Sequence, residues 1–260
     1  MKGIILAGGT GSRLYPLTKA VNKHLLPVGR YPMIVHVLMQ FVRARIRNVL
    51  LVTGPEHIQA FARLLGDGRV FGLDLTYKVQ VEPGGIAEAL GLARGFVGAD
   101  RCLVMLGDNL VDGSLAAEVT AFARGPGGAC LLLKPVADVR PYGCAEIRDE
   151  KIVSLIEKPP EAKPGFAVTG VYLYDGRVFD YIDSLTPSGR GEYEITDVNR
   201  AYLEDGLLDY RVWPDLWLDA GTFSALALAN EWFFNMEYPV IIDKENPVYS
   251  RWTDWTTKNR

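Results

Sequence analysis

Hydrophobic residues in the first half of the chain follow two different spacings. Short continuous hydrophobic runs and strictly alternating segments are typical of strands, whereas repeats at three and four residues are typical of helices. The segments with strand spacing are residues 3–7, 48–53, 73–81 and 102–106, and those with helix spacing are residues 32–42, 58–65 and 86–96. This alternation of strand and helix predicts a mainly parallel sheet with helices on both faces.

After about residue 128 the pattern becomes mixed. Two short strands separated by charged residues predict a hairpin, and Thr222 is a suitable N-cap for a late helix. The strands expected here are residues 129–135, 145–148, 152–156 and 168–174, and the expected helices are residues 177–184, 194–204 and 222–234. Because no linker or repeat divides the chain, we expect one Rossmann-like α/β domain over residues 1–260. Its ligands should bind at the carboxyl ends of the strands.

Composition and charge narrow the class of protein. The chain is 48% hydrophobic and 23% charged, which is ordinary for a globular protein, and its net charge of −3 creates no general attraction for nucleic acid. The three cysteines are far apart, the three histidines form no pair with zinc-ligand spacing, and no hydrophobic run approaches the roughly 20 residues of a membrane span. We therefore expect a cytoplasmic protein that binds neither nucleic acid nor a membrane. The basic cluster of Arg43, Arg45 and Arg47 is expected to be solvated.

Aromatic residues gather at the C-terminal end of the chain. They are Trp232, Phe233, Phe234, Trp252 and Trp255. We expect this tail, residues 231–260, to pack against the domain or against a second copy of the chain in a homo-oligomer.

A glycine-rich loop follows the first predicted strand directly. Its sequence, Gly8-Gly9-Thr10-Gly11-Ser12-Arg13, lacks the third glycine of a dinucleotide fingerprint and the GK[ST] of a Walker A loop. Glycines allow backbone N–H groups to approach an anion, and Arg13 and Lys23 add the charges that suit a triphosphate. The glycines alone are equally explained as a turn that leaves the strand.

Two aspartates follow predicted strands far apart in the sequence. Asp108 stands in Gly-Asp-Asn and Asp219 in Leu-Asp-Ala-Gly, just before a helix. Each alone is as well explained as a turn former or a helix cap. Together, in a chain with a triphosphate loop, they suit Mg²⁺, which combines a few carboxylates with phosphate oxygens.

Other polar residues have a plain structural explanation as well as a functional one. Gln80 ends a predicted strand, where glutamine is usually solvated, although it could donate to and accept from a pyrimidine base at once. Glu157 and Lys158 could be a surface pair at the end of the hairpin, and the glutamates after Arg190 favour a helix start.

Residues 6–18 and 23–28 together resemble the signature of the sugar-1-phosphate nucleotidyltransferases. Within that family the chain is most similar, over residues 2–230, to the shorter thymidylyltransferases that act on glucose 1-phosphate. The resemblance implies a nucleotide-diphospho-sugar transferase fold. It also implies that residues 1–128 bind the nucleotide and that residues 129–230 bind the sugar phosphate.

The resemblance also implies a role for each matching residue. Those expected to bind the nucleotide are Leu6, Gly8, Gly9, Thr10, Gly11, Ser12, Arg13, Lys23, Gln80, Gly85 and Asp108. Those expected to bind the sugar phosphate are Asn109, Tyr142, Gly143, Glu157, Lys158, Val168, Tyr172 and Arg190. Asp108 and Asp219 are the expected Mg²⁺ ligands, and Cys144 and Ala145 replace bulkier residues common in the family.

The expected reaction joins a nucleoside triphosphate, dTTP, to a sugar 1-phosphate, glucose 1-phosphate, and releases pyrophosphate. The residues expected to carry catalysis are Arg13, Lys23, Asp108, Lys158 and Asp219. The nucleophile is already an anion, so no general base is expected, and no serine or cysteine motif suggests a covalent intermediate. Two alternatives stay open, a transferase that uses UTP and a silent relative that binds nucleotide sugars and regulates a partner. The length further predicts no appended domain and weak or absent feedback by the nucleotide sugar at a second site.

Overall fold

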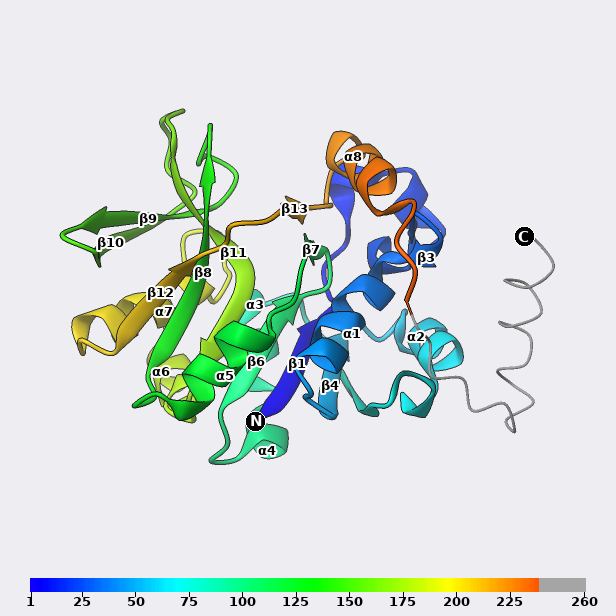
Figure 1. The fold of residues 1–260 in the computed structure, drawn as a ribbon, viewed down its shortest axis with the longest axis horizontal. Helices are drawn as coiled ribbons and strands as arrows, with labels where there is room; N and C mark the ends of the chain where they lie inside the picture. The colour runs from blue at the N-terminus through cyan, green and yellow to red at the C-terminus, as the bar shows by residue number, and fades with distance from the viewer. Residues whose placement is uncertain (239–260) are drawn as a thin grey trace.

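A mixed sheet of nine strands forms the centre of the molecule in the computed structural model, which describes residues 1–238 (Figure 1). Seven strands follow the order β10-β9-β11-β6-β1-β4-β5, and β8 pairs with β11 and with β12. The strands are β1 (Lys2–Leu6), β4 (Asn48–Thr53), β5 (Asp74–Val79), β6 (Cys102–Leu106), β8 (Ala129–Val136), β9 (Gly143–Arg148), β10 (Lys151–Glu157), β11 (Gly165–Tyr174) and β12 (Leu208–Val212). Two small sheets pair β2 (Pro27–Val28) with β3 (Tyr31–Pro32) and β7 (Asn109–Val111) with β13 (Trp217–Asp219).

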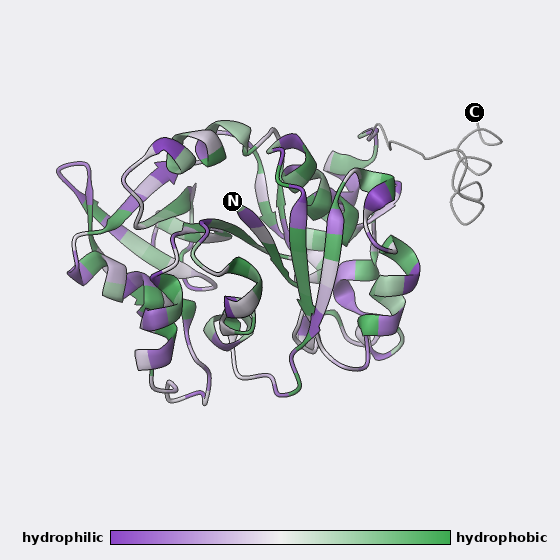
Figure 2. Cartoon of the chain, turned by 90° about the horizontal axis from the view of Figure 1, so that it is seen from below, coloured by the Kyte–Doolittle hydropathy of each residue, from purple (hydrophilic) through white to green (hydrophobic). Residues whose placement is uncertain are grey.

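Helices cover both faces of this sheet, as the alternation of elements predicts. They are α1 (Met33–Arg43), α2 (Ile58–Leu65), α3 (Ile86–Gly91), α4 (Arg94–Val97), α5 (Ala116–Arg124), α6 (Val178–Ser184), α7 (Ile195–Glu204) and α8 (Phe223–Phe233). Figure 2 shows hydrophobic residues along the central strands and mixed hydropathy on the helices around them. The expected mixed α/β sheet flanked by helices is confirmed.

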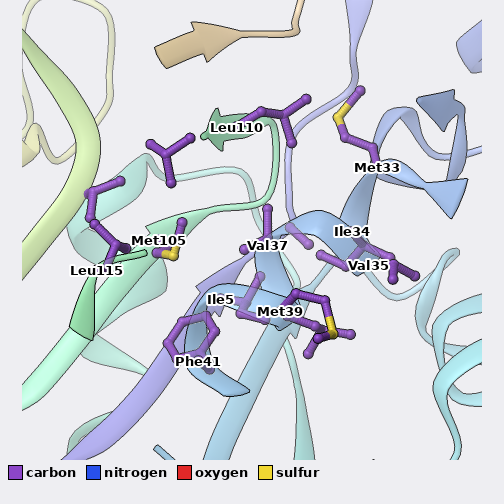
Figure 3. Packing of buried hydrophobic residues seen from close by; sticks show 14 of the residues in the cluster. Ile5, Met33, Ile34, Val35, Val37, Met39, Phe41, Met105, Leu110 and Leu115 are labelled. Atoms are coloured by element: carbon purple, nitrogen blue, oxygen red, sulfur yellow. The ribbon is translucent and has the colours of Figure 1, made fainter. Parts of the chain in front are cut away.

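The two faces of the sheet carry separate hydrophobic cores. Neighbouring residues of β1 alternate between them, with Ile5 in the core beneath α1, α2, α5 and α8 and Ile4 in the core beneath α3, α4, α6 and α7. Figure 3 shows Val37 and Phe41 of α1 in the first of these layers, close to Ile5. Phe233, from the aromatic end of the described chain, is buried in the same core.

Parallel pairing brings several strand ends to one edge of the sheet. β1 pairs in parallel with both β4 and β6, and β4 pairs in parallel with β5, so these four strands end on the same side. β11 then runs antiparallel to β6 and joins this parallel part to the hairpin of β9 and β10. The carboxyl ends of the parallel strands therefore face the mixed second half of the chain (Figure 1).

Several local predictions differ from the structure. The single helix expected over residues 86–96 is wrong, because the chain forms two short helices, α3 and α4, separated by a turn at Leu92 and Ala93 that directly follows Gly91, a residue of low helix propensity. Strands β2, β3, β7, β12 and β13 and helix α5 were not predicted. Arg43 is partly buried rather than simply solvated, since its Nη1 donates to the carbonyl of Gly113 at 2.6 Å, whereas Arg45 and Arg47 are exposed as expected.

Other expectations concern the N-cap of α8, membrane spans and the tail. Thr222 caps α8 as predicted, because its hydroxyl accepts from the N–H of Ala225 at 3.3 Å. Within residues 1–238, no helix combines the length and the hydrophobicity that crossing a membrane requires. Trp252 and Trp255, on which part of the tail prediction rests, lie outside the described residues.

Candidate active site

A cavity of about 540 Å³ lies at the carboxyl ends of the parallel strands, between them and the second half of the chain. Its volume suits a small-molecule ligand. It is lined by sixteen of the residues expected from the sequence, which are Leu6, Gly8, Gly9, Arg13, Lys23, Gln80, Gly85, Asp108, Asn109, Tyr142, Gly143, Glu157, Lys158, Val168, Tyr172 and Asp219. The four expected residues that do not line it are Thr10, Gly11, Ser12 and Arg190.

The glycine loop holds Arg13 at the mouth of this cavity. Gly11 adopts a φ of 64°, and a Cβ there would lie 2.7 Å from Thr18, so this turn favours glycine. The Thr18 hydroxyl donates to the carbonyl of Gly11 at 2.9 Å and fixes the turn. Leu14 is completely buried, while the side chain of Arg13 stays 52% exposed. The loop thus anchors one residue in the core and leaves its neighbour available to a ligand.

A small antiparallel ladder brings Asp108 and Asp219 together from distant parts of the sequence. In the pairing of β7 with β13, Asp219 lies opposite Asn109, and the N–H of Ala220 donates to the carbonyl of Asp108 at 2.9 Å. The amide oxygen of Asn109 is buried and accepts from Gly170 at 3.0 Å and from the indole of Trp217 at 2.7 Å. The ladder therefore rests on a polar side chain whose oxygen accepts two hydrogen bonds.

Each of the two aspartates faces a basic side chain. Lys23 donates to the carboxylate of Asp108, and a guanidinium nitrogen of Arg13 lies 3.5 Å from a carboxylate oxygen of Asp219. We call Arg13, Lys23, Asp108 and Asp219 the loop end of the cavity.

The two carboxylates of the loop end differ in their electrostatics. Burial alone would raise the pKa of Asp108, but the ammonium of Lys23 holds that pKa well below its ordinary value. The pKa of Asp219 is raised, first by burial and then by the negative charge of Asp108. Two carboxylates that repel each other in this way form a place where a cation is favourable.

The opposite end of the cavity is built by the hairpin and the start of α7. Arg190 donates to Glu194 at 2.8 Å and also lies 3.5 Å from Glu157. The hydroxyl of Thr196 donates a hydrogen bond to the carboxylate of Glu157. Lys158 lies 3.7 Å from Glu157, and its ammonium side chain is 48% exposed. We call Glu157, Lys158, Arg190 and Glu194 the hairpin end.

Charge on the cavity wall is unbalanced. Five acidic residues line it against three basic ones, and Arg190 adds a fourth positive charge from outside the lining. The acidic residues are Asp108, Glu157, Glu192, Glu194 and Asp219, and the basic ones are Arg13, Lys23 and Lys158. Among residues 1–238, no three His, Cys, Asp or Glu side chains are grouped to hold a metal ion. Asp108 and Asp219 can therefore serve a cation only together with oxygens that a ligand or water supplies.

Gln80 forms the wall between the glycine loop and the start of α3. Its backbone N–H donates to the carbonyl of Thr53 at 2.9 Å, and its side-chain nitrogen donates to Gly85 at 3.3 Å and to the carboxylate of Glu88. Gly85 has a φ of 101°, and a Cβ there would lie 2.6 Å from the carbonyl of Tyr193. This close approach joins the wall beside Gln80 to the loop that carries Arg190.

Some cavity residues were missed by sequence reasoning. Glu194 was interpreted only as favouring a helix start, and Thr196 and Trp217 were assigned no role, yet all three line the cavity. His24 also lines it, and burial followed by the charge of Lys23 lowers its pKa to about 3, so this histidine is neutral. For His24 and Glu194 a signal was available, because both lie within the segments that carry residues expected to bind ligand.

The chain is similar to a known family over most of its length. The sequence profile of the nucleotidyl transferase family matches residues 2–234. Glucose-1-phosphate thymidylyltransferase of Neisseria meningitidis is 44% identical over 230 residues, which are 87% of this chain and 80% of the relative. The enzyme of the same name from Mycobacterium tuberculosis is 42% identical over 241 residues, 91% of this chain and 83% of the relative.

Solved structures give the same result. A Bacillus anthracis protein assigned as a glucose-1-phosphate thymidylyltransferase, solved with sucrose, superposes with a TM-score of 0.88 at 50% identity and covers 92% of this chain and 97% of its own. A UDP-glucose pyrophosphorylase complexed with UDP-glucose has a TM-score of 0.79 at 21% identity and covers 90% of this chain and 98% of its own. At that low identity the second likeness shows the fold alone.

Proposed function

The chain belongs to the nucleotidyl transferase family, and we propose that it forms dTDP-glucose and pyrophosphate from dTTP and glucose 1-phosphate. The two bacterial relatives described above are both named glucose-1-phosphate thymidylyltransferase, which supports this pair of substrates. Under this proposal residues 1–128 bind the nucleotide and residues 129–230 bind the sugar phosphate.

One observation carries the proposal. The loop end and the hairpin end face a single cavity, and the two carboxylates of the loop end come from opposite halves of the sequence. A reaction between two phosphorylated substrates needs such an arrangement, because each must be held by its own cations while their phosphates meet.

The proposed roles follow from position and charge. Arg13, beside the glycine loop, offsets the negative charge of the triphosphate and of the departing pyrophosphate. Lys158, whose ammonium has one long contact, to Glu157, among the described residues, binds the phosphate of the sugar and directs its oxygen toward the α-phosphorus in line with the leaving group. Arg190 supports that end through its bonds to Glu194 and Glu157.

Protonation and charge at the loop end suit direct attack. The attacking oxygen of a sugar 1-phosphate is already an anion, so no residue has to remove a proton from it. Lys23 keeps Asp108 ionised, as the lowered pKa of that carboxyl indicates, and counters the charge that develops on the α-phosphate.

We propose that Asp108 and Asp219 hold Mg²⁺ when the nucleotide is bound. Their mutual repulsion and the excess of acidic residues on the wall fit a divalent cation, and the phosphates of the substrate would complete the ligand set. When bound, Mg²⁺ neutralises phosphate charge and polarises the α-phosphoryl group. A homo-oligomer in the cytoplasm remains our prediction for the assembly and location.

Pyrophosphate release on mixing dTTP, glucose 1-phosphate and Mg²⁺ tests this function. We expect turnover with that pair to exceed turnover with UTP, with other sugar 1-phosphates and without Mg²⁺. Fastest turnover with UTP would select the uridylyl alternative. Binding of dTDP-glucose without pyrophosphate release from any pair would select the silent regulatory relative.

A further inference from the structure

We infer that Glu88, a residue outside the cavity, is a positioning residue that determines which bases the nucleotide site accepts. It does so by fixing the side-chain amide of Gln80 with its oxygen toward the ligand. The inference rests on the proposed function in one respect, that the cavity beside Gln80 receives the base of a nucleotide.

The side-chain nitrogen of Gln80 donates two hydrogen bonds within the protein. That nitrogen donates to the carbonyl of Gly85 at 3.3 Å and to a carboxylate oxygen of Glu88. Gln80 is only 8% exposed, and its backbone N–H, just after β5, donates to the carbonyl of Thr53 at the end of β4. A primary amide carries two N–H donors, so both are used within the protein.

The same contacts settle which way the amide points. A carbonyl oxygen and a carboxylate can only accept hydrogen bonds, so a reversed amide would bring the oxygen of Gln80 against two acceptors in a buried place. The side-chain oxygen of Gln80 therefore points away from Gly85 and Glu88 and toward Gly8. A Cβ added at Gly8 would lie 3.0 Å from this oxygen. Gly8 and Gln80 both line the cavity.

Backbone hydrogen bonds of its two neighbours fix the helical turn that carries Glu88. Glu88 lies in the first turn of α3, where the N–H of Ala87 donates to the carbonyl of Tyr193 at 3.1 Å and the N–H of Ala89 donates to Gly85 at 3.2 Å. Glu88 does not line the cavity, so its carboxylate acts on a ligand through Gln80.

Gln80 consequently offers the base an acceptor and no donor. The sequence had suggested that it would donate and accept at once, and both of its donors are instead used by the protein. A lone acceptor matches the ring N–H of thymine and uracil, whereas cytosine presents an unprotonated ring nitrogen at that position and would be repelled. The site should accept both imide pyrimidines and reject cytosine.

Two substitutions of Glu88 separate hydrogen bonding from charge and size. Glu88→Gln loses the charge but keeps an oxygen that can accept from Gln80, and Glu88→Met has similar length but no such acceptor. Both are compared with the unaltered chain by calorimetry of dTTP and dCTP binding, without sugar phosphate, and by kcat and KM for each nucleotide with glucose 1-phosphate. Glu88→Ala replaces the methionine variant if that variant does not fold, as judged by circular dichroism.

We expect the dTTP-to-dCTP affinity ratio to fall by about tenfold or more in Glu88→Met and to stay within about threefold in Glu88→Gln, because only the former lets the amide turn. The change should appear in KM more than in kcat. Equal ratios in the two variants would overturn the inference, and so would equal affinity of the unaltered chain for dTTP and dCTP. Selective dTTP binding without turnover would instead contradict the proposed function alone.

Discussion

The loop end and the hairpin end of the cavity both pair basic with acidic side chains, but the pairs differ in burial. At the loop end the side chains of Lys23 and Asp108 are 15% and 8% exposed and form a direct pair, beside Arg13, which is 52% exposed. At the hairpin end Lys158 and Arg190 are 48% and 44% exposed, and Arg190 is shared among several glutamates. Buried pairs are costly to break, whereas exposed pairs contribute little.

This difference separates two tasks. The buried pair at the loop end fixes charge before any substrate arrives, as suits a site that must receive both a triphosphate and a cation. The exposed cations of the hairpin end can exchange water for a phosphate at little cost, and Lys158, whose ammonium has one long contact within residues 1–238, is freer to do so than Arg190. Four substitutions at the two ends, followed by a change of pH, test this comparison.

Asp108→Asn should have the largest effect. It removes a charge that Lys23 faces in a buried place and one of the two proposed Mg²⁺ ligands, so we expect kcat to fall by about 10³-fold or more while nucleotide binding partly survives. Initial rates and calorimetry with dTTP measure the two effects. Asp149→Asn, an exposed hairpin-turn position with a φ of 48° that asparagine tolerates, is the matched control. Unchanged Mg²⁺-dependent turnover would exclude Asp108 as a ligand.

Arg13→Ala and Lys158→Ala remove one cation from each end. Each should lower kcat/KM by about 10²- to 10³-fold, because each donor is aimed at charge that develops in the reaction. The two ends should be distinguished by which KM rises, that of the nucleotide for Arg13→Ala and that of the sugar phosphate for Lys158→Ala. Lys151→Ala, at the exposed start of β10, serves as the control. Activity within tenfold of the unaltered enzyme would argue against the assignment.

Arg190→Ala should have a smaller effect on the rate. The guanidinium is bonded to Glu194 and lies near Glu157, so we expect it to act mainly by holding those carboxylates and to lose about 10- to 30-fold in kcat/KM. Arg190→Lys should recover part of the loss. A decrease as large as that of Lys158→Ala would mean that Arg190 contacts the phosphate directly.

Acid should destabilise the folded chain through its buried histidines. All three histidines lie within residues 1–128, and burial lowers the pKa of His36 from 6.5 to about 4. Between pH 6.5 and pH 4 the unfolded chain binds a proton at this histidine that the folded chain does not. The free energy of unfolding therefore falls as the pH falls through this range, and the contribution of His36 is constant above about pH 6.5.

For His36 alone, the free energy of unfolding should decrease by about 2–3 kcal/mol between pH 7 and pH 4.5. Urea unfolding at the two pH values measures it, and His36→Gln should show a smaller difference between them. The glutamine can still bond to Val28 or Tyr238, the two partners of the imidazole. An identical pH difference in the variant would contradict this origin of the acid sensitivity.

Local signals in the sequence were enough to predict much of the first half. Strand Asn48–Thr53, helix Ile58–Leu65 and strand Cys102–Leu106 have the predicted bounds, because a hydrophobic run and its flanking residues decide each of them. The long helix expected before Cys102 was wrong, since the chain turns at Leu92 and Ala93, directly after Gly91, within a spacing that otherwise favours a helix.

The contacts that complete the site depend on residues far apart in the sequence. β7 and β13 have three residues each, too few to show a period, and they form only by pairing with each other. Family resemblance could point to Asp108 and Asp219, but only the ladder explains why they meet. The contacts of the two Gln80 donors with Gly85 and Glu88 span only five and eight residues, but they depend on how α3 is placed behind β5.

A rapid-quench measurement of pyrophosphate tests the central claim, that the two ends of one cavity hold two substrates for direct transfer. The enzyme is mixed with dTTP and Mg²⁺, with or without glucose 1-phosphate, at enzyme concentrations that make one equivalent visible. We predict pyrophosphate only when both substrates are present, in equal amount with dTDP-glucose, and none from Asp108→Asn on the same time scale. One equivalent of pyrophosphate per enzyme without the sugar phosphate would show a nucleotidyl-enzyme intermediate and contradict the account.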